Sequence, residues 1–314
     1  METQLTGDFD ALVTGGAGFI GSNLVDALVA RNWRVKVIDN LSTGRLANLE
    51  HHLSNSAVEF LKLDLKDSDP TLKNLGDVGL VFHFAANPEV KLSTVEPRIH
   101  FQENVVTTFN LLEALRMRGR AQKLVFASTS AVYGDSEDPK ATEESALRPV
   151  SVYGASKVCC ETLMQTYFRL YGMESACLRF ANIIGTRMKY GVIWDFAQKL
   201  LRDRGMLEIL GDGRQVRSYL DVSDAVKAVL TIADNRSNGF EAYKLGNRDW
   251  LSVDEVATLV TNVFGSQATR TYRPVLSGVG WPGDVKRIIL STAKLELLGF
   301  IPPMTSGQAV TSAF

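Results

Sequence analysis

Tyr153 and Lys157 are well suited by type and spacing to acid–base chemistry in this 314-residue chain. They stand four positions apart in a run that begins a segment with a helical pattern. Residues four apart on a helix lie one turn from each other on the same face, so the phenol and the ammonium can act together. With 8 Tyr in the chain, such a pair also arises by chance, and its meaning depends on its place in the fold.

Three consecutive hydroxyl residues, Ser128, Thr129 and Ser130, close the predicted strand that precedes this helix. The carboxyl end of a strand lies at the mouth of an α/β sheet, where such proteins bind their ligands. The alternative is a solvated turn with no ligand. The position of the cluster, next to the Tyr–Lys helix, favours the ligand site.

A glycine-rich turn, Thr14 to Gly21, follows the first predicted strand directly and opens the first helix. The spacing Gly-x-x-Gly-x-x-Gly lets the backbone turn tightly and present N–H groups to a pyrophosphate at the helix N-terminus. Glycine also serves ordinary strand-to-helix turns, so the triplet alone is a weak signal.

Asp39 ends the second predicted strand, 18 residues beyond Gly21. A carboxylate there can accept hydrogen bonds from the adenosine ribose hydroxyls and would repel a 2′-phosphate, which favours NAD over NADP. The other interpretation is that Asp39 and Asn40 only cap a turn. Glycine turn, strand and acid in the correct order together indicate a dinucleotide site.

The elements that must position these residues form a repeated βα pattern over the first 180 residues. Continuous apolar runs predict strands covered on both faces by helices, and hence a Rossmann-like, doubly wound parallel sheet. The predicted strands are Ala11–Thr14, Arg34–Ile38, Val58–Leu63, Leu80–Phe84, Lys123–Ser128 and Ser175–Phe180.

After Gly185 the pattern changes to helices near Trp194–Arg204, Val222–Ala233 and Val253–Phe264, with short strands such as Leu207–Leu210 and Tyr243–Gly246. We therefore expect an NAD-binding domain over residues 1–180. Residues 181–314 are expected to form mainly a smaller α/β substrate-binding lobe, with some segments returning to the first domain. No low-complexity linker separates the two, so they should pack around a cleft.

Composition excludes several classes of function. The 34 basic and 35 acidic residues give a net charge of −1, with no basic cluster for nucleic acid or for an anionic membrane. The 3 cysteines lack metal-ligand or redox spacing and are interpreted as packing residues in a reducing compartment. No metal site is expected. The polar start of the chain and the lack of a long apolar run predict a cytoplasmic protein.

Taken with the motifs above, further short stretches make the chain similar to one family. It resembles the extended short-chain dehydrogenase/reductases, in their nucleotide-sugar epimerase/dehydratase branch and most closely the UDP-glucose 4-epimerase group. The resemblance covers about Ala11 to Phe300. The matching stretches are Thr14–Gly21, Asp39–Gly44, Asp64-Leu65, His83–Ala86, Asn104, Ser128–Gly134, Tyr153–Lys157, Arg179–Asn182 and Gly211–Gly213.

This resemblance implies an NAD site and a substrate site for a UDP-sugar. The implied cofactor residues are Gly15, Gly18, Phe19, Ile20, Gly21, Asp39, Asn40, Ser42, Thr43, Gly44, Asp64, Leu65, Ala85, Ala86, Asn104, Ser128, Tyr153, Lys157 and Phe180. The implied substrate residues are Asn182, Val192, Leu207, Ile209, Arg217 and Asp284.

The resemblance also implies a mechanism, in which Tyr153 takes the proton of the sugar's C4 hydroxyl while C4 gives a hydride to the nicotinamide. The 4-keto sugar then turns over and receives the hydride on its other face. A base at neutral pH needs the tyrosine pKa lowered by about three units, roughly 4 kcal/mol, and the expected sources are the Lys157 ammonium and the positive charge of the nicotinamide. Thr129, or as second candidate Ser130, should hold O4.

Position 130 and its neighbour separate the branches of the family. Dehydratases carry an Asp-Glu pair there and UDP-glucuronate decarboxylases a nearby Glu, whereas this chain has Ser130 and Ala131. We therefore expect a UDP-hexose 4-epimerase, most simply for glucose and galactose. UDP-N-acetylhexosamine or UDP-glucuronate epimerases are alternatives, and a non-catalytic NAD-binding sensor is the alternative from another class.

One position departs from the family. Its common Arg-x-Gly-Asp reads Trp281-Pro282-Gly283-Asp284 here, so an arginine expected on the diphosphate is missing unless Arg273 replaces it. The planar fork of Arg217 suits the remaining diphosphate contact, the alternative being a surface charge. The helices Asn104–Met117 and Tyr153–Tyr171 match the family's dimer-forming pair and predict a homodimer through a four-helix bundle.

Overall fold

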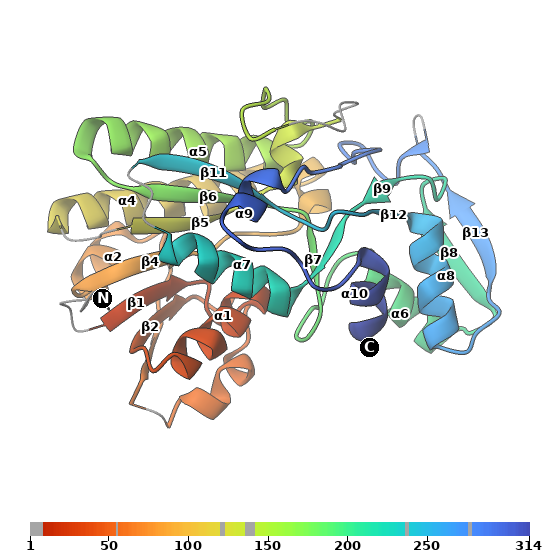
Figure 1. Cartoon of the computed structure of the whole chain (residues 1–314), viewed down its shortest axis with the longest axis horizontal. Coiled ribbons are helices and arrows are strands. Elements are labelled where there is room, and N and C mark those ends of the chain that lie inside the picture. Colours follow the sequence, from red (N-terminus) through yellow and green to blue (C-terminus); the bar gives the residue numbers. More distant parts are fainter. Residues whose placement is uncertain (1–8, 55, 120–122, 136–141, 236–238, 276–277) are drawn as a thin grey trace.

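A computed structural model of the chain describes residues 9–54, 56–119, 123–135, 142–235, 239–275 and 278–314. Its centre is a seven-stranded parallel sheet in the order β11-β6-β5-β4-β1-β2-β3 (Figure 1). The strands are β1 Phe9–Thr14, β2 Val35–Asp39, β3 Val58–Lys62, β4 Val78–His83, β5 Lys123–Thr129, β6 Ser175–Phe180 and β11 Phe240–Leu245. The predicted Rossmann-like, doubly wound α/β sheet is confirmed.

Both faces of the sheet are covered, which explains the continuous apolar runs of its strands. In β1, Ala11 and Val13 belong to one core cluster, whereas Leu12 between them belongs to the other. Successive side chains of a strand point to opposite faces, so both faces must be apolar. Helices α1 (Phe19–Ala30) and α7 (Val222–Asp234) pack together on the first face.

The second face carries α2 (Ser68–Asn74), α4 (Thr107–Arg118) and α5 (Val152–Tyr171) (Figure 1). Short helical turns connect several elements. They are η1 Leu46–Asn48, η2 Glu50–His52, η3 Val90–Thr94, α3 Pro97–His100, the π-helical η4 Phe101–Val106 and η5 Ser130–Tyr133.

Most of the remaining elements gather beyond the carboxyl edge of the sheet, at the right of Figure 1, whereas α9 packs against β11. They form three two-stranded sheets, β10-β7, β12-β9 and β13-β8, with helices beside them. The elements are β7 Asn182–Ile184, α6 Val192–Arg202, β8 Met206–Leu210, β9 Val216–Arg217, β10 Tyr219–Asp221, β12 Leu251–Ser252, α8 Val253–Val263, β13 Thr269–Arg273, α9 Ala293–Leu297 and α10 Ser306–Ser312. Phe196 of α6 and Val256 of α8 belong to the same core cluster as β1, so the two regions share one apolar interior.

One predicted strand of the second region lies elsewhere. The stretch predicted at Tyr243–Gly246 is part of β11, which pairs with β6 in the central sheet. Helix α7 precedes it and packs on α1, so residues 222–245 form a further βα-type crossover of the first region. Ala242, Tyr243 and Leu245 are buried although β11 is an edge strand of this sheet, because α5 (Val152–Tyr171) and α9 (Ala293–Leu297) pack against it.

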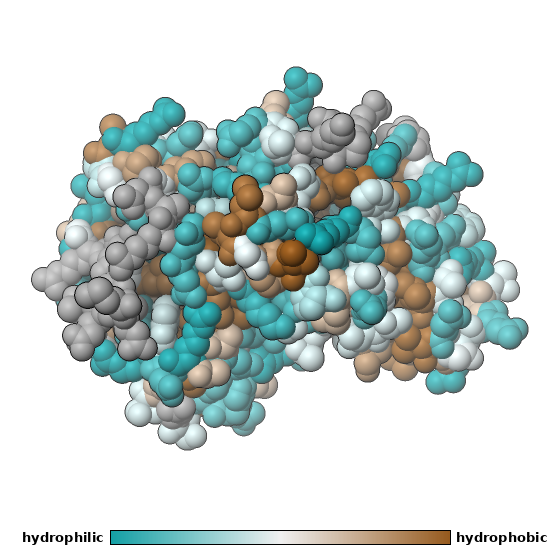
Figure 2. Space-filling model, in the orientation of Figure 1, coloured by the Kyte–Doolittle hydropathy of each residue, from teal (hydrophilic) through white to brown (hydrophobic). Residues whose placement is uncertain are grey.

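The surface seen in the same view is mostly hydrophilic, and its apolar side chains lie in separate groups (Figure 2). Among the residues described here, every helix is too short or too polar to cross a lipid bilayer. The polar N-terminal stretch of residues 1–8 and part of the basic run before Lys123 lie outside the described residues.

Candidate active site

The glycine-rich turn packs too closely for side chains at two of its glycines. Gly15 has a φ of +69°, and a Cβ atom there would lie 2.6 Å from the backbone nitrogen of Ala85. A Cβ atom on Gly21 would collide with the carbonyl of Gly15. Helix α1 begins after Gly18, which offers no side chain to cap the first-turn amides. The turn is therefore an uncapped helix N-terminus facing the end of β4, which is the form that phosphate-binding turns take.

Asp39 closes this turn against the loop that follows β2. Its carboxylate accepts hydrogen bonds from the backbone N–H of Ala17, at 3.0 Å, and of Leu41, at 2.7 Å. Burial raises the pKa of Asp39, and the two N–H donors oppose that shift. Gly44 packs so close that a Cβ there would lie 2.9 Å from a carboxylate oxygen. Asp39 thus caps the turn, as one of the two interpretations of the sequence predicted. Its carboxylate oxygens keep further lone pairs that can accept hydrogen bonds from a ribose.

The other predicted cofactor residues lie around the same edge of the sheet. Asn40 donates to Asp64 at 3.1 Å, and the Phe84 and Phe180 rings lie 6.1 Å apart across the strand ends. Most of the set lies at or just after the carboxyl end of a strand, whereas the others come from the helical elements α1, η4 and α5. The helical members are Phe19, Ile20, Gly21, Asn104, Tyr153 and Lys157. The strand-end members are Gly15, Gly18, Asp39, Asn40, Ser42, Thr43, Gly44, Asp64, Leu65, Ala85, Ala86, Ser128 and Phe180.

Tyr153 lies in the first turn of α5, directly opposite the end of β5. The helix starts there because the Ser151 side chain caps it, accepting from Gly154 N–H at 3.1 Å. The buried Tyr153 hydroxyl makes a side-chain hydrogen bond with Thr129, and its ring packs edge-on against His100 at 5.6 Å. The structure thus brings Thr129 to the phenol, whereas the second candidate, Ser130, is buried in η5.

Burial raises the pKa of Tyr153 to about 12, although the Thr129 hydrogen bond opposes the shift. The lowering expected from Lys157 and the nicotinamide charge together is not produced by the lysine alone. The reason is the position of Lys157, whose Nζ donates to the Ala127 carbonyl at 2.7 Å and lies 4.6 Å from the centre of the Phe126 ring. Burial also lowers the pKa of Lys157 to about 8. The chain by itself therefore holds the phenol protonated.

Asn104 occupies the π-helical turn η4 and links two elements. Its amide donates to the Ser156 hydroxyl at 2.9 Å, and its oxygen accepts from the Asn87 N–H at 2.9 Å. Irregular π-turns of this kind often mark functional sites. Asn104 therefore ties the loop after β4 to the face of α5 that carries Tyr153.

A buried ionic network beneath the site was not singled out by sequence reasoning. Glu161 pairs with Arg179 at 2.8 Å and accepts a hydrogen bond from Ser128, and Arg179 donates to the Tyr133 hydroxyl at 2.6 Å. Both charged side chains are at most 6% exposed. A signal existed, because Glu161 follows Lys157 by four residues on the same helix face.

Tyr190 is a second residue whose contact was not predicted. Its ring meets Phe19 of the glycine turn edge-on at 6.1 Å. Desolvation raises its pKa, and the nearby Tyr153 adds to the shift. Tyr190 thus lies between the nucleotide turn and the phenol.

Two of the predicted substrate residues contact each other. Arg217 of β9 forms an ion pair with Asp284, Nη2 to Oδ1 at 3.0 Å, and both are largely buried. The Arg217 guanidinium also donates to the backbone carbonyl of Val285. Arg217 is therefore an ordered, paired residue, and the surface-charge interpretation is wrong.

The remaining predicted substrate residues divide into two groups. Asn182 is exposed in β7 and Val192 half-buried at the start of α6. Leu207 and Ile209, which the resemblance places in the strand beside the uracil, have side chains fully buried in the core, so their place beside a substrate stays a prediction that involves the backbone of β8. Alternation along β8 turns these two inward, which leaves only the strand's backbone and other face for a ligand.

The structure also shows the surroundings of Trp281, which stands where the family commonly has an arginine, and of Arg273, its possible replacement. Arg273 is mostly exposed and pairs with Glu208 at 2.9 Å, so it does not replace the missing arginine. Trp281 has a buried indole Nε1 that lacks a hydrogen-bond partner among the described residues. Of the cysteines, Cys160 and Cys177 pack in the interior as expected, but Cys159 is exposed on α5.

Comparisons with known proteins give one consistent family. Residues 11–246 match the model of the NAD dependent epimerase/dehydratase family. The UDP-glucose 4-epimerase of Mycolicibacterium smegmatis is 33% identical over 305 residues, covering 95% of either chain. A crystal structure of UDP-galactose 4-epimerase has 44% identity and a TM-score of 0.85, with 96% of each chain covered. The UDP-glucose 4-epimerase of Thermotoga maritima, solved with UDP-glucose, has 31% identity and a TM-score of 0.87, again with 96% of each chain covered.

Proposed function

The chain belongs to the NAD-dependent epimerase/dehydratase family, and we propose that it inverts C4 of a UDP-hexose, interconverting UDP-glucose and UDP-galactose. The observation that carries this proposal is the placement of Tyr153 and Lys157 on α5 against the end of β5, with the Lys157 ammonium on the Ala127 carbonyl and the phenol beside Thr129. The 4-epimerases to which the chain is similar over almost its whole length support the same activity.

The glycine turn fits NAD. The close approach of Gly15 to Ala85 and the uncapped start of α1 suit a pyrophosphate, and Asp39 and Asp64 lie where an adenosine would be held. Bound NAD supplies the hydride acceptor of the reaction and returns the same hydride, so it is not consumed. The carboxylate of Asp39, already fixed by two backbone N–H groups, selects against a 2′-phosphate by charge.

Tyr153 is the proposed base, and it removes the proton of the C4 hydroxyl. A phenol with a pKa of about 12 is almost fully protonated at neutral pH, so its role requires an added positive charge in the pocket. The Lys157 ammonium has three donors and uses one on the Ala127 carbonyl, which leaves two for a ribose or for the phenol. Thr129, fixed on Tyr153, holds the sugar oxygen in line with the phenol.

The residues beside Thr129 support epimerisation over elimination. The side chains of Ser130 and Ala131 carry no carboxyl group, so neither residue supplies a carboxylic acid next to the sugar. Elimination of water would need such an acid to protonate the leaving hydroxyl. The pocket can therefore move a proton and hold a ketone at C4.

The UDP part of the substrate is proposed to bind between β9 and the segment around Asp284. Arg217 offers the planar fork suited to a diphosphate. The buried Nε1–H of Trp281 adds one further donor in place of the family's second arginine. A neutral indole gives a weaker contact than a charged guanidinium, so we expect modest affinity for free UDP.

The test uses protein purified without added cofactor. It should carry bound NAD and convert UDP-glucose to an equilibrium mixture with UDP-galactose, followed by NMR, and Tyr153→Phe should retain NAD but lose turnover. Bound NAD with no reaction on any of a panel of UDP-hexoses, UDP-N-acetylhexosamines and UDP-glucuronate would instead favour the non-catalytic sensor. Turnover of another member of the panel alone would move the substrate assignment to that sugar.

We infer also that the protein is a cytoplasmic homodimer formed through α4 and α5. The two helices pack on each other, with Tyr167 donating to Glu113 at 2.6 Å, and they and the adjoining η4 leave large apolar side chains exposed. These are Phe101, Phe109, Met117, Val152, Leu170 and Tyr171. Light scattering should give twice the chain mass, and Phe109→Glu should give the monomer. A wild-type monomer at micromolar concentration would contradict the inference.

A further inference from the structure

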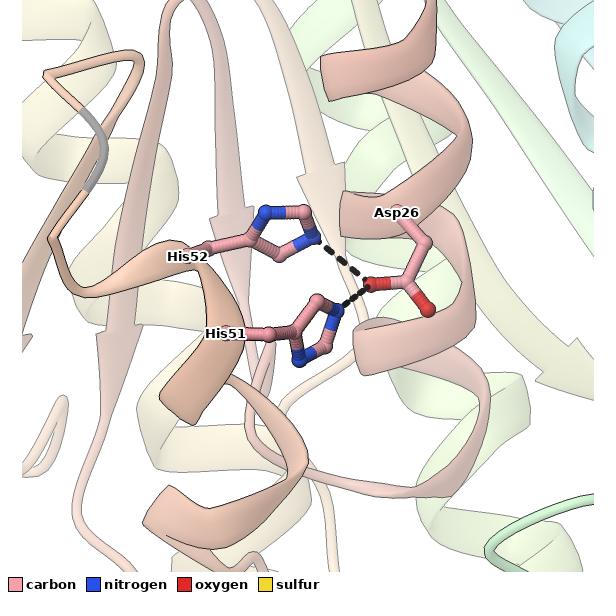
Figure 3. Close-up of side chains that lie close together, drawn as sticks. All are labelled: Asp26, His51 and His52. Carbon is pink, nitrogen blue, oxygen red and sulfur yellow. Dashed lines mark hydrogen bonds and ion pairs between the residues drawn. The ribbon is translucent and has the colours of Figure 1, made fainter.

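Asp26, His51 and His52 converge on one point outside the candidate active site (Figure 3). The Nε2 atoms of His51 and His52 lie 3.0 and 2.8 Å from the same carboxylate oxygen, Oδ1 of Asp26. All three potential ligand atoms lie within 4.8 Å of one another. Because both imidazoles are directed at Oδ1 of Asp26, the other carboxylate oxygen, Oδ2, remains available to another partner.

Two elements of the fold, α1 and η2, hold these three side chains in place. Asp26 lies on α1, and the two histidines lie on the short turn η2, whose preceding residue Leu49 is fully buried and anchors it. The two imidazole rings lie 4.0 Å apart, centre to centre, and each directs its Nε2 atom to Oδ1 of Asp26. His52 is mostly covered and His51 half-exposed, which leaves one side of the cluster open to water.

Arg187 fixes the carboxylate from its other side. Its Nη1 lies 2.8 Å from Oδ2 of Asp26, so only Oδ1 faces the histidines. Arg187 belongs to the turn after β7, which connects the sheet region to the second region. A carboxylate held by a second partner is the usual condition of a metal ligand, although the positive charge of Arg187 lowers the affinity for a cation.

We propose that Asp26, His51 and His52 form a binding site for one divalent transition-metal ion of the zinc type, with water completing its coordination. Two neutral imidazole nitrogens and one carboxylate oxygen are a common ligand set for zinc. Bond lengths of about 2.0–2.2 Å would place the ligand atoms about 3.4 Å apart in a tetrahedral site. Each imidazole would therefore have to move back from Oδ1 of Asp26, from which the Nε2 atoms now lie 3.0 and 2.8 Å. Each imidazole keeps one proton, which moves from Nε2 to Nδ1 when the metal binds.

This site is independent of the proposed epimerase reaction, because none of its residues belongs to the proposed catalytic or nucleotide-binding sets. The competing explanation is a hydrogen-bonded clasp in which both histidines donate to Asp26 and no metal binds. The remaining two histidines of the chain, His83 and His100, are fully buried, so an added metal ion has no other exposed imidazole in the described residues. The exposed thiol of Cys159 is the main competing ligand.

The test is a calorimetric titration of untagged, chelator-treated protein with Zn²⁺, with Co²⁺ as an optical probe of the coordination geometry. The wild type should bind one ion per chain. His52→Ala and Asp26→Asn should each weaken binding by at least about tenfold. Cys159→Ser is the matched control and should bind as the wild type does, and circular dichroism checks that each variant is folded.

Three results would overturn the proposal. They are the absence of saturable binding to the wild type, undiminished affinity in the folded His52→Ala and Asp26→Asn variants, and loss of binding in Cys159→Ser. Because Asp26→Asn keeps a side chain of the same shape, a loss of affinity in that variant reports the missing carboxylate and not a cavity. Loss of epimerase activity would not bear on the metal site, nor would loss of metal bear on the reaction.

Discussion

Arg217 and Asp284, which are 67 positions apart in the chain, form an ion pair with Nη2 3.0 Å from Oδ1. The arginine is 14% exposed and the aspartate 7%, and the guanidinium also donates to backbone carbonyls on both sides. The guanidinium of Arg217 is therefore held in a fixed orientation, but its charge is already compensated by Asp284. A diphosphate must compete with Asp284 for the guanidinium.

Arg217→Ala should weaken UDP binding by about tenfold or more, because a hydrogen bond to a charged group contributes about 1.5–3 kcal/mol. Calorimetry with UDP measures the change. Arg217→Lys is the matched variant, since it keeps the charge beside Asp284 but loses the planar fork, and it should bind UDP with intermediate affinity. Equal affinity in all three proteins would remove Arg217 from the substrate site.

Thr129→Val should lower kcat by about 10²–10³-fold with little change in KM for the UDP-sugar, because it removes the hydroxyl that fixes the phenol. Ser130→Ala is the control, and its kcat should stay near that of the wild type. Steady-state kinetics of both variants separates the two candidates for the O4 contact. A larger loss in Ser130→Ala than in Thr129→Val would reverse the assignment.

The raised pKa of Tyr153 predicts that protein stripped of NAD has no phenolate at this position below about pH 10. The tyrosinate absorbance of the wild type minus that of Tyr153→Phe follows this residue alone. Adding NAD should move the difference signal to lower pH, because a positive charge enters a buried pocket and favours the phenolate. A phenolate signal near neutral pH in stripped protein would show that the chain itself lowers the pKa.

Sequence reasoning predicted the sheet and the main candidate residues because their signals are local. Apolar runs specify buried strands, and the turn from Thr14 to Gly21 has its own spacing. The sequence could not specify contacts that depend on the tertiary structure. The direction of the Lys157 ammonium depends on the Ala127 carbonyl of a neighbouring strand, and the inward face of Leu207 depends on the packing of β8.

The same reason explains what the sequence did not predict. Glu161 and Arg179 meet from a helix and a strand, and Asp26 meets His51 across 25 positions. None of these pairs has a spacing that marks it in the chain. The neighbouring histidines of η2 were visible in the sequence, but the carboxylate they share was not.

Glu161→Ala should destabilise the fold by about 3–5 kcal/mol, because it leaves the buried Arg179 charge without its carboxylate. Denaturant unfolding measures the loss. Glu161→Gln keeps the hydrogen-bonding shape and should cost less, while a Glu161→Ala variant as stable as the wild type would show that the network does not support the fold. The amount of NAD bound to each purified variant then shows whether the substitution also affects cofactor binding.

Unfolding stability should fall as the pH drops below about 6.5, and His83 is one cause. Its ring is fully buried between Thr14, 2.7 Å from Nδ1, and Thr108, 2.9 Å from Nε2, and burial lowers its pKa to about 3. Between these two pH values the unfolded chain binds a proton at this histidine and the folded chain does not. Stability therefore rises with pH across this window, by up to about 1.4 kcal/mol per unit for one group. Urea midpoints at several pH values should show this slope in the wild type and a reduced slope in His83→Gln, which keeps polar atoms between the two threonines. An unchanged slope in that variant would mean that His83 titrates alike in both states, and that the hydrogen bonds to Thr14 and Thr108 do not hold it neutral.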